Sequence, residues 1–218
     1  MIRVALANEP ASFDSVVRQP GLRAIAQMVG ERPLMPDGSA VRGRPYKVRA
    51  ASRTELKGEH YPDIWTEALP DLMREYGQIC AFCSLVIPWG TGAKSVDHFV
   101  AKSRNWERVY EWSNYRLACA QVNGEKGDLD GILDPFEIED AWFALEFVAF
   151  QVVVGDNVVE PLWSAVDYTI KELKISNPEF CKAREQYFQD YRSGDISLNH
   201  LRANAPFVFR EMQRQGLL

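Results

Sequence analysis

The sequence has no feature that marks a secreted or membrane protein. Its amino-terminal stretch, MIRVALANEPASF, contains no apolar run of the kind found in signal peptides, and no segment approaches the roughly 18 consecutive apolar residues of a membrane span. The four cysteines are too few and too unevenly spaced for the disulfide framework of a small secreted domain. We therefore expect a cytoplasmic protein whose cysteines are buried or bind a metal.

An excess of basic residues is also absent. The net charge at pH 7 is −5, whereas a protein that coats nucleic acid unaided needs a concentrated basic face, because its affinity comes from displaced counterions. We expect any nucleic-acid binding to be local or shared with a partner. With 218 residues, of which 46% are hydrophobic, the chain is long enough for one or two small domains with a proper core.

The spacing of apolar residues predicts several helices. From Tyr61 to Tyr76 these residues recur at steps of three and four, which indicates an amphipathic helix, although Pro70 is able to kink or break it. Three further helices are expected in the C-terminal part, at residues 163–174, 178–192 and 197–214.

Short apolar runs predict strands in the middle of the chain. Strands are expected within residues 79–87 and at Ser95–Val100. A strand or turn beginning at Asn114 then leads into a short helix that ends near Lys126.

Turn-forming residues predict the connections. The aromatic and β-branched run at 142–154 indicates a hairpin, which we expect Gly155-Asp156-Asn157 to close. Two more turns are expected in the N-terminal part, at Pro20-Gly21 and Pro36-Asp37-Gly38.

Four short motifs follow one another in the middle of the chain, between residues 80 and 128. They are Cys80-Ala-Phe-Cys83, Asp97-His98, Asn114, and the stretch from Cys119 to Asp128. Each alone has an ordinary explanation, since a lone histidine is more often packed than catalytic, an asparagine often caps a turn, and a Cys-x-x-Cys pair does not always bind metal. Their order and spacing together are more specific than any one of them.

In this combination the motifs resemble the HNH, or ββα-metal, nuclease family, in which a Cys-x-x-Cys knuckle precedes Asp-His, Asn, and a terminal His or Asn. The resemblance implies that Asp97 and Asn123 bind the catalytic metal, that His98 is the general base and that Asn114 fixes a loop. Lys126 matches a lysine that faces the phosphate in several members of the family.

These roles suit the hydrolysis of a phosphodiester, which needs an activated water and neutralised charge on the phosphoryl and leaving oxygens. A hard cation such as Mg2+ or Mn2+ prefers oxygen ligands, which Asp97 and Asn123 offer. A neutral imidazole, with an unperturbed pKa of about 6.5, accepts a proton near neutral pH. We expect His98 to lie in a surface cleft and to contribute little to the core.

The sequence departs from the family at the second cysteine pair, which reads Cys119-Ala-Gln-Val122. Many members hold a structural zinc ion with four thiolates, and structural zinc sites are normally closed by four protein ligands. Cys80, Cys83 and Cys119 either bind zinc with a remote ligand such as His60, or pack with Val122 as an apolar cluster that replaces the metal. The second arrangement is the one we expect.

Basic side chains near the motifs are candidates for contacts with nucleic acid. The expected phosphate ligands lie within the motif region and are Lys102, Arg104, Arg108 and Arg116. An earlier basic run, from Arg42 to Lys57, is either the wall of a nucleic-acid groove or a solvated loop, and the sequence leaves both explanations open.

A longer resemblance extends over most of the chain. The stretch from Tyr110 to Cys119, the run Lys126-Gly-Asp128 and the run Ile132-Leu-Asp-Pro135-Phe136 are similar to a branch of HNH proteins encoded in bacterial anti-phage operons. In the Septu system and in some retrons, such a subunit works beside an ATPase. The resemblance implies DNA as the substrate and an ATPase partner that supplies binding or control.

We therefore predict an α+β protein, mainly helical, that acts as a divalent-metal-dependent DNA endonuclease. It is expected to form one compact unit from a helical and loop segment at 1–77, a ββα-metal core at 78–130, and a hairpin with helices at 131–218. The alternative is a non-catalytic nucleic-acid-binding or regulatory module of HNH shape, which the missing cysteine favours. A redox role for Cys80 and Cys83 is disfavoured, because no thioredoxin-like βαβ pattern surrounds them.

Overall fold

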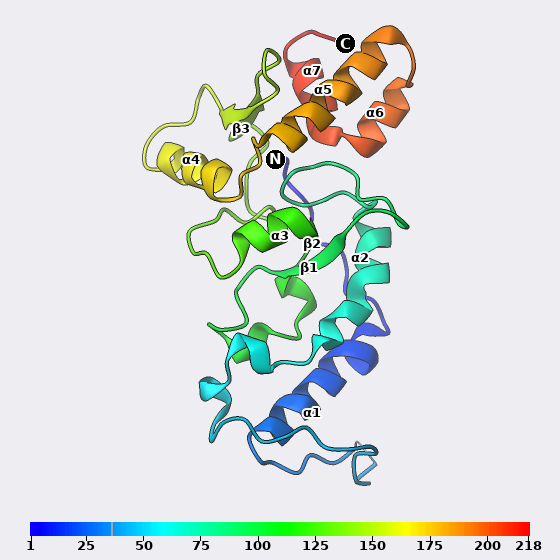
Figure 1. Cartoon of the computed structure of the whole chain (residues 1–218), viewed down its shortest axis with the longest axis vertical. Helices are drawn as coiled ribbons and strands as arrows, with labels where there is room; N and C mark the ends of the chain where they lie inside the picture. Colours follow the sequence, from blue (N-terminus) through cyan, green and yellow to red (C-terminus); the bar gives the residue numbers. More distant parts are fainter. Residues whose placement is uncertain (36) are drawn as a thin grey trace. The chain divides into compact units, whose positions relative to one another are not determined.

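A computed structural model describes residues 1–35 and 37–218 of the chain. Pro36, the first residue of the predicted Pro36-Asp37-Gly38 turn, lies outside the described residues. Within them the fold is α+β, with seven α-helices and two small antiparallel sheets, in agreement with the predicted class (Figure 1). No helix in this described part is long and apolar enough to cross a membrane.

The chain divides into two compact units. Unit 1 consists of Met1–Ala7, Leu72–Asp97 and Arg116–Leu218, and unit 2 consists of Asn8–Asp71 and His98–Tyr115. Residues 78–130, the expected nuclease core, contribute to both units. The excess of acidic residues lies in unit 1, whereas unit 2 has nearly equal numbers of acidic and basic residues.

Unit 2 contains a helical stretch made of a π-helical turn, η1 (Asp14–Arg18), and α1 (Gln19–Met28). Pro20-Gly21, predicted as a turn, lies instead in the first turn of α1, the part of a helix that tolerates proline best. A Cβ atom on Gly21 would lie 2.2 Å from Cγ of Tyr110, so glycine is what lets the helix approach this ring. The turn prediction is wrong because close packing requires this glycine.

The stretch predicted as one helix from Tyr61 to Tyr76 forms a 3₁₀ helix, η4 (Asp63–Ala68), that runs into α2 (Leu69–Glu75). Pro70 is the second residue of α2, where a missing N–H costs no α-helical hydrogen bond. The proline therefore marks the beginning of the α-helix and does not kink a longer one. Two shorter 3₁₀ helices precede this stretch, η2 (Arg53–Glu55) and η3 (Gly58–His60).

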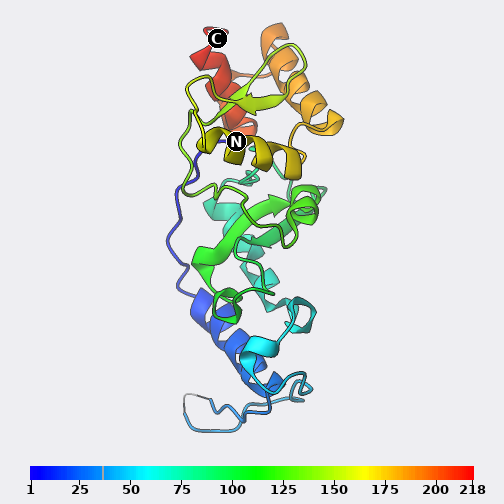
Figure 2. The same cartoon turned by 90° about the vertical axis from the view of Figure 1, so that its left-hand side faces the viewer.

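Strand β1 (Lys94–His98) pairs with β2 (Tyr115–Cys119), and α3 (Ala120–Lys126) follows β2 directly (Figure 2). The sequence predicts a strand at Ser95–Val100 and a strand or a turn before the short helix, and the structure forms a strand at the second place. The strands predicted within residues 79–87 form only an isolated bridge between Ile79 and Val86. Two short 3₁₀ helices lie between β1 and β2 in the sequence, η5 (Trp106–Arg108) and η6 (Trp112–Asn114).

The second sheet is a hairpin of β3 (Phe143–Leu145) and β4 (Val152–Val154). Its connection lies between the strands, where the Glu146 carboxylate accepts hydrogen bonds from three backbone N–H groups of the loop. The prediction that Gly155-Asp156-Asn157 closes the hairpin is therefore wrong. A Cβ atom on Gly155 would lie 2.0 Å from the carbonyl oxygen of Ala141, so this glycine permits a close backbone approach beyond the strand end.

Four helices make up the C-terminal part of unit 1 (Figure 1), namely α4 (Leu162–Glu172), α5 (Pro178–Ser193), α6 (Leu198–Asn204) and α7 (Pro206–Arg214). The single helix predicted at 197–214 is two helices, because Pro206 begins a new one after Ala205 leaves the helical conformation. Helices α5, α6 and α7 pack on one another, and Leu201, Phe207 and Met212 are fully buried there. Burial of each such side chain contributes about 1.5–3 kcal/mol.

Candidate active site

Asn114 ties together the two ends of a loop in unit 2. The residue is fully buried at the end of η6, and its Oδ1 accepts the N–H of Val100 at 2.8 Å. Its Nδ2 donates to the carbonyl oxygens of Val100 and Arg108 at 3.0 and 2.9 Å. These bonds satisfy the buried amide and hold the backbone from Val100 to Arg108 in one conformation.

His98, the last residue of β1, is enclosed by aromatic side chains of unit 2. The ring centroids of Trp65 and Tyr115 lie 4.8 and 5.1 Å from the imidazole centroid, both in edge-on contact. Only 8% of His98 is exposed. The expectation of a surface residue that contributes little to the core is therefore wrong, because two aromatic contacts make this ring part of the packing.

A backbone carbonyl determines which nitrogen of His98 is basic. Nε2 lies 2.9 Å from the carbonyl oxygen of Val109, which also accepts the hydroxyl of Tyr115 at 2.9 Å. A carbonyl only accepts, so Nε2 carries a proton, and Nδ1 is the basic nitrogen of the neutral ring. The fold therefore selects Nδ1 of His98 as the atom able to take a proton.

Asp97 and Lys126 form a buried ion pair within unit 1. Oδ1 of Asp97 lies 3.0 Å from Nζ of Lys126, and the two side chains are 2% and 1% exposed. Burial raises the pKa of Asp97 to about 6, while the charge of Lys126 acts in the opposite direction. Lys126 was expected to face a phosphate. That expectation needs correction, because the ammonium is enclosed and lies against a carboxylate.

The second carboxyl oxygen of Asp97 and the amide oxygen of Asn123 are the atoms that the predicted metal site would use. Oδ2 of Asp97 is buried and has no hydrogen-bond partner among the described residues. Asn123, on α3, donates through Nδ2 to Oγ of Ser95 at 2.6 Å, which leaves its carbonyl oxygen as the acceptor of the amide. Two oxygen donors on β1 and α3 of the same unit fit the ligand preference of Mg2+ or Mn2+.

Three cysteines of unit 1 form a second candidate metal site. Their sulfur atoms all lie within 4.8 Å of one another, and they belong to Cys80, Cys83 and Cys119. Hydrogen bonds from the other two thiols lower the pKa of Cys119 to about 3, and burial raises the pKa of Cys80 to about 12. This group of cysteines is able to hold a metal ion, and Val122 beside it is fully buried.

We expect the purified protein to contain less than one equivalent of zinc. Three thiolates leave the tetrahedral ion without a fourth protein ligand, because Val122 occupies the position of the missing cysteine. Elemental analysis after dialysis, together with the same measurement on Cys83→Ser, tests this expectation. Cys181→Ser, outside the cluster, is the matched control. One full equivalent of tightly held zinc in the wild type would contradict the expectation and indicate a remote ligand.

The predicted phosphate ligands lie in different environments. Arg116 is 3% exposed and paired with Asp134, with 2.8 Å between Nε and Oδ1, and its guanidinium stacks 3.5 Å from the ring centroid of Phe136. Its assignment as a phosphate ligand is therefore wrong, because the side chain is enclosed by a carboxylate and a ring. Three candidates in unit 2 retain solvent exposure, namely Lys102, Arg104 and Arg108.

The contacts that surround His98 are not predicted by the sequence patterns. Trp65 lies within the apolar stripe between Tyr61 and Tyr76, and Tyr115 lies within the motif stretch from Tyr110 to Cys119. Val109 acts through its backbone carbonyl, which no pattern of side chains reveals. The concentration of aromatic residues between Trp106 and Tyr115 was the one available sign that this segment encloses a ring.

No protein-family model matches this chain, and no curated protein matches its sequence. What the candidate site is able to do must therefore follow from its own geometry and chemistry.

Proposed function

We propose that this chain is a metal-dependent HNH-type endonuclease that hydrolyses DNA phosphodiesters with His98 as the general base. The observation that carries the proposal is the orientation of His98, whose Nε2–H donates to Val109 and whose Nδ1 is basic. A general base must present a lone pair in a fixed position near neutral pH. The loop that Asn114 holds in place includes the residues just before Val109, so the orientation of the base has a second support.

In the proposed reaction, Nδ1 of His98 accepts a proton from the attacking water. The water oxygen forms a bond to phosphorus as the bond from phosphorus to the leaving oxygen breaks. The hydrogen bond from Nε2 to Val109 persists and stabilises the imidazolium ion that results. Asp97 and Asn123 would hold the metal ion. When bound, Mg2+ or Mn2+ neutralises charge on the phosphoryl and leaving oxygens.

One observation favours the alternative, a non-catalytic HNH-like binding or regulatory module. The ammonium of Lys126 lies 3.0 Å from Asp97, and both groups are buried. A cation at this distance opposes the binding of a second cation by the same carboxylate. The two functions therefore differ in whether Asp97 binds a divalent ion.

Asp97→Ala is expected to weaken Mg2+ or Mn2+ binding by at least about tenfold, or 1.4 kcal/mol. The reason is the loss of the only charged oxygen ligand in the proposed pair. Titration calorimetry of the wild type and Asp97→Ala measures the metal affinity of each protein. Asp167→Ala on α4 is the control for a lost carboxylate. Equal affinities in wild type and Asp97→Ala would remove Asp97 from the ligand set.

We also propose that the isolated chain binds DNA weakly and that a co-encoded ATPase, of the kind found with Septu and retron nucleases, tightens the binding. The acidic excess of unit 1 and the enclosure of Arg116 both reduce the number of available phosphate contacts. Fewer contacts mean lower affinity and a shallower dependence on salt.

Cleavage of plasmid DNA in Mg2+ or Mn2+, with and without the co-purifying partner, tests the proposed function. We expect cleavage that requires the metal and increases when the partner is added. Absence of cleavage under both conditions would contradict the nuclease proposal and favour the binding module. Nanomolar binding of DNA by the chain alone, with a steep salt dependence, would contradict the need for a partner.

A further inference from the structure

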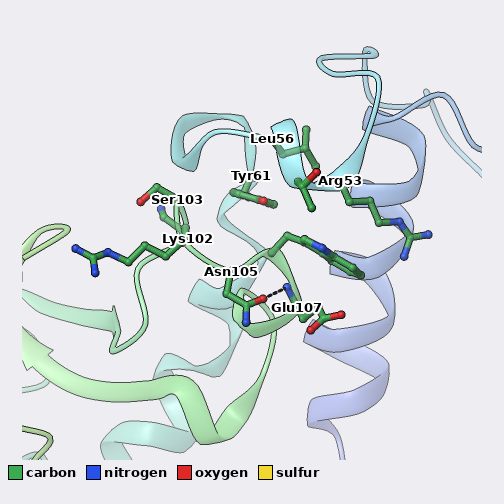
Figure 3. A pocket seen from close by; sticks show the side chains of 10 residues that line it. Arg53, Leu56, Tyr61, Lys102, Ser103, Asn105 and Glu107 are labelled. Atoms are coloured by element: carbon green, nitrogen blue, oxygen red, sulfur yellow. Dashed lines mark hydrogen bonds between the residues drawn. The ribbon is translucent and has the colours of Figure 1, made fainter. Parts of the chain in front are cut away.

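A polar pocket of about 250 Å³ lies wholly within unit 2 (Figure 3). Two segments line it, one around η2 and η3 and the other between β1 and η5. Figure 3 shows Arg53, Leu56 and Tyr61 from the first segment opposite Lys102 and Ser103 from the second. No role assigned so far to His98 or to the metal ligands uses this pocket.

Tyr61 lines this pocket, and its hydroxyl is a hydrogen-bond donor that no described residue uses. The residue is only 4% exposed, and its hydroxyl is buried without a hydrogen-bond partner among the described residues. Burial raises the pKa of Tyr61, so the hydroxyl stays protonated at neutral pH. Buried hydroxyl groups almost always have a hydrogen-bond partner, so this hydroxyl is a donor that a bound acceptor is able to use.

The pocket lining carries more positive than negative charge. Arg53, Lys102 and Arg104 contribute to it, with Glu107 as the acidic residue of the lining. Arg53 also forms an ion pair with Glu31, with 2.7 Å between Nη2 and Oε2, so an anion in the pocket would share this guanidinium with Glu31. Two of the cations lie over aromatic rings, since Arg53 is 5.0 Å from the ring centroid of Trp106 and the ammonium of Lys102 is 3.9 Å from that of Trp65. Such contacts restrict long side chains and lower the entropic cost of binding an anion.

We propose that this pocket binds a backbone phosphate of a nucleic-acid strand, separate from the phosphate that is cut. Phosphate oxygens accept hydrogen bonds from hydroxyl, guanidinium and ammonium groups, which are the groups that Tyr61, Arg53 and Lys102 provide. The cavity of about 250 Å³ has room for a phosphate group. Asn105 accepts the N–H of Glu107 at 2.9 Å, and this bond fixes the turn on one side (Figure 3).

Trp65 relates this pocket to the proposed base. One face of its ring receives the ammonium of Lys102, and the ring also makes an edge-on contact with His98. A strand held by Lys102 therefore passes close to His98. This step rests on the proposed nuclease function, whereas phosphate binding by the pocket does not.

The test is binding of a short fluorescent single-stranded oligodeoxynucleotide, followed by anisotropy in EDTA so that no cleavage occurs. Tyr61→Phe is expected to weaken binding about tenfold, because a hydrogen bond to a charged group is lost. Lys102→Gln should also lower the slope of log affinity against log salt by about 0.7, the value for one single-strand phosphate. Tyr168→Phe on α4 and Lys182→Gln on α5, both at exposed or half-exposed positions of unit 1, are the matched controls and should leave binding unchanged.

If the Tyr61 hydroxyl had a structural role instead, Tyr61→Phe would melt below the wild-type temperature. Because this hydroxyl has no partner in the chain, Tyr61→Phe should melt at the wild-type temperature or above it while binding DNA more weakly. Binding by Tyr61→Phe as tight as that of the wild type would overturn the proposal. Complete displacement of the oligonucleotide by inorganic phosphate at a similar concentration would overturn the assignment to a strand and indicate a site for free phosphate.

Failure of the nuclease proposal gives a separate result. If DNA is never cut, yet Tyr61→Phe and Lys102→Gln weaken binding in EDTA, the phosphate-binding role of the pocket is supported and the catalytic assignment is contradicted. If the wild type cuts DNA and both variants bind and cut as it does, the catalytic assignment stands and the pocket is overturned.

Discussion

Replacement of His98 by glutamine is expected to lower the rate of the proposed DNA cleavage by about 10²–10⁴-fold, the usual cost of losing a positioned general base. Glutamine keeps an amide N–H that is able to donate to the carbonyl of Val109, as Nε2 of His98 does. It has no nitrogen that accepts a proton near neutral pH. The measurement is single-turnover cleavage, compared with the melting temperature of each protein.

Alanine is the poorer substitution at this position. His98→Ala removes a ring that packs against Trp65 and Tyr115, so it opens a cavity and lowers stability as well as activity. His200→Gln, at an exposed position of α6, is the matched control and should cut at the wild-type rate. Folded His98→Gln with an unchanged rate would remove His98 from the mechanism.

Replacement of Arg116 by methionine is expected to lower the free energy of unfolding by about 3–5 kcal/mol, because it leaves the carboxylate of Asp134 buried without its partner. The methionine side chain retains the apolar contact with Phe136 but not its charge. Unfolding in urea, followed by tryptophan fluorescence, gives the free energy.

The control for Arg116→Met is a surface ion pair. Lys171→Met breaks the pair with Asp167 on α4, where the lysine is mostly exposed, and should cost less than about 1 kcal/mol. The double variant Arg116→Met with Asp134→Leu should recover part of the lost stability, since neither charge then remains buried alone. A loss from Arg116→Met no larger than that of Lys171→Met would contradict the structural role of the arginine.

Local sequence patterns predicted the elements whose formation depends on neighbouring residues. The strand expected at Ser95–Val100, the strand or turn expected from Asn114 and the short helix that ends near Lys126 correspond to β1, β2 and α3. The separate helices expected at 163–174 and 178–192 correspond to α4 and α5. The errors at Gly21 and Gly155 have another origin. Each glycine is required by an atom far away in the sequence, on Tyr110 or Ala141, so its neighbours carry no information about its role.

In the candidate site, too, some features were expected from the sequence and others depend on contacts between residues far apart in the chain. The resemblance to the HNH family assigned a loop-fixing role to Asn114, and its side-chain hydrogen bonds to Val100 and Arg108 are those that such a role needs. The pairing of Lys126 with Asp97 and of Arg116 with Asp134 was not predicted. A basic residue in a motif looks the same in sequence whether it faces phosphate or a buried carboxylate, because its partner is chosen only when the chain folds.

The carbonyl of Val109 determines by which ring nitrogen His98 gains and loses a proton in the proposed reaction. In many enzymes the far nitrogen of a catalytic histidine faces a carboxylate, which shares the charge of the imidazolium ion. The far nitrogen of His98 faces a carbonyl instead, and a carbonyl does not take up a proton. Any proton gained at Nδ1 must therefore leave from Nδ1. Nδ1 is therefore the only ring nitrogen of His98 that exchanges protons, and at the end of each turnover it must contact water or the departing strand.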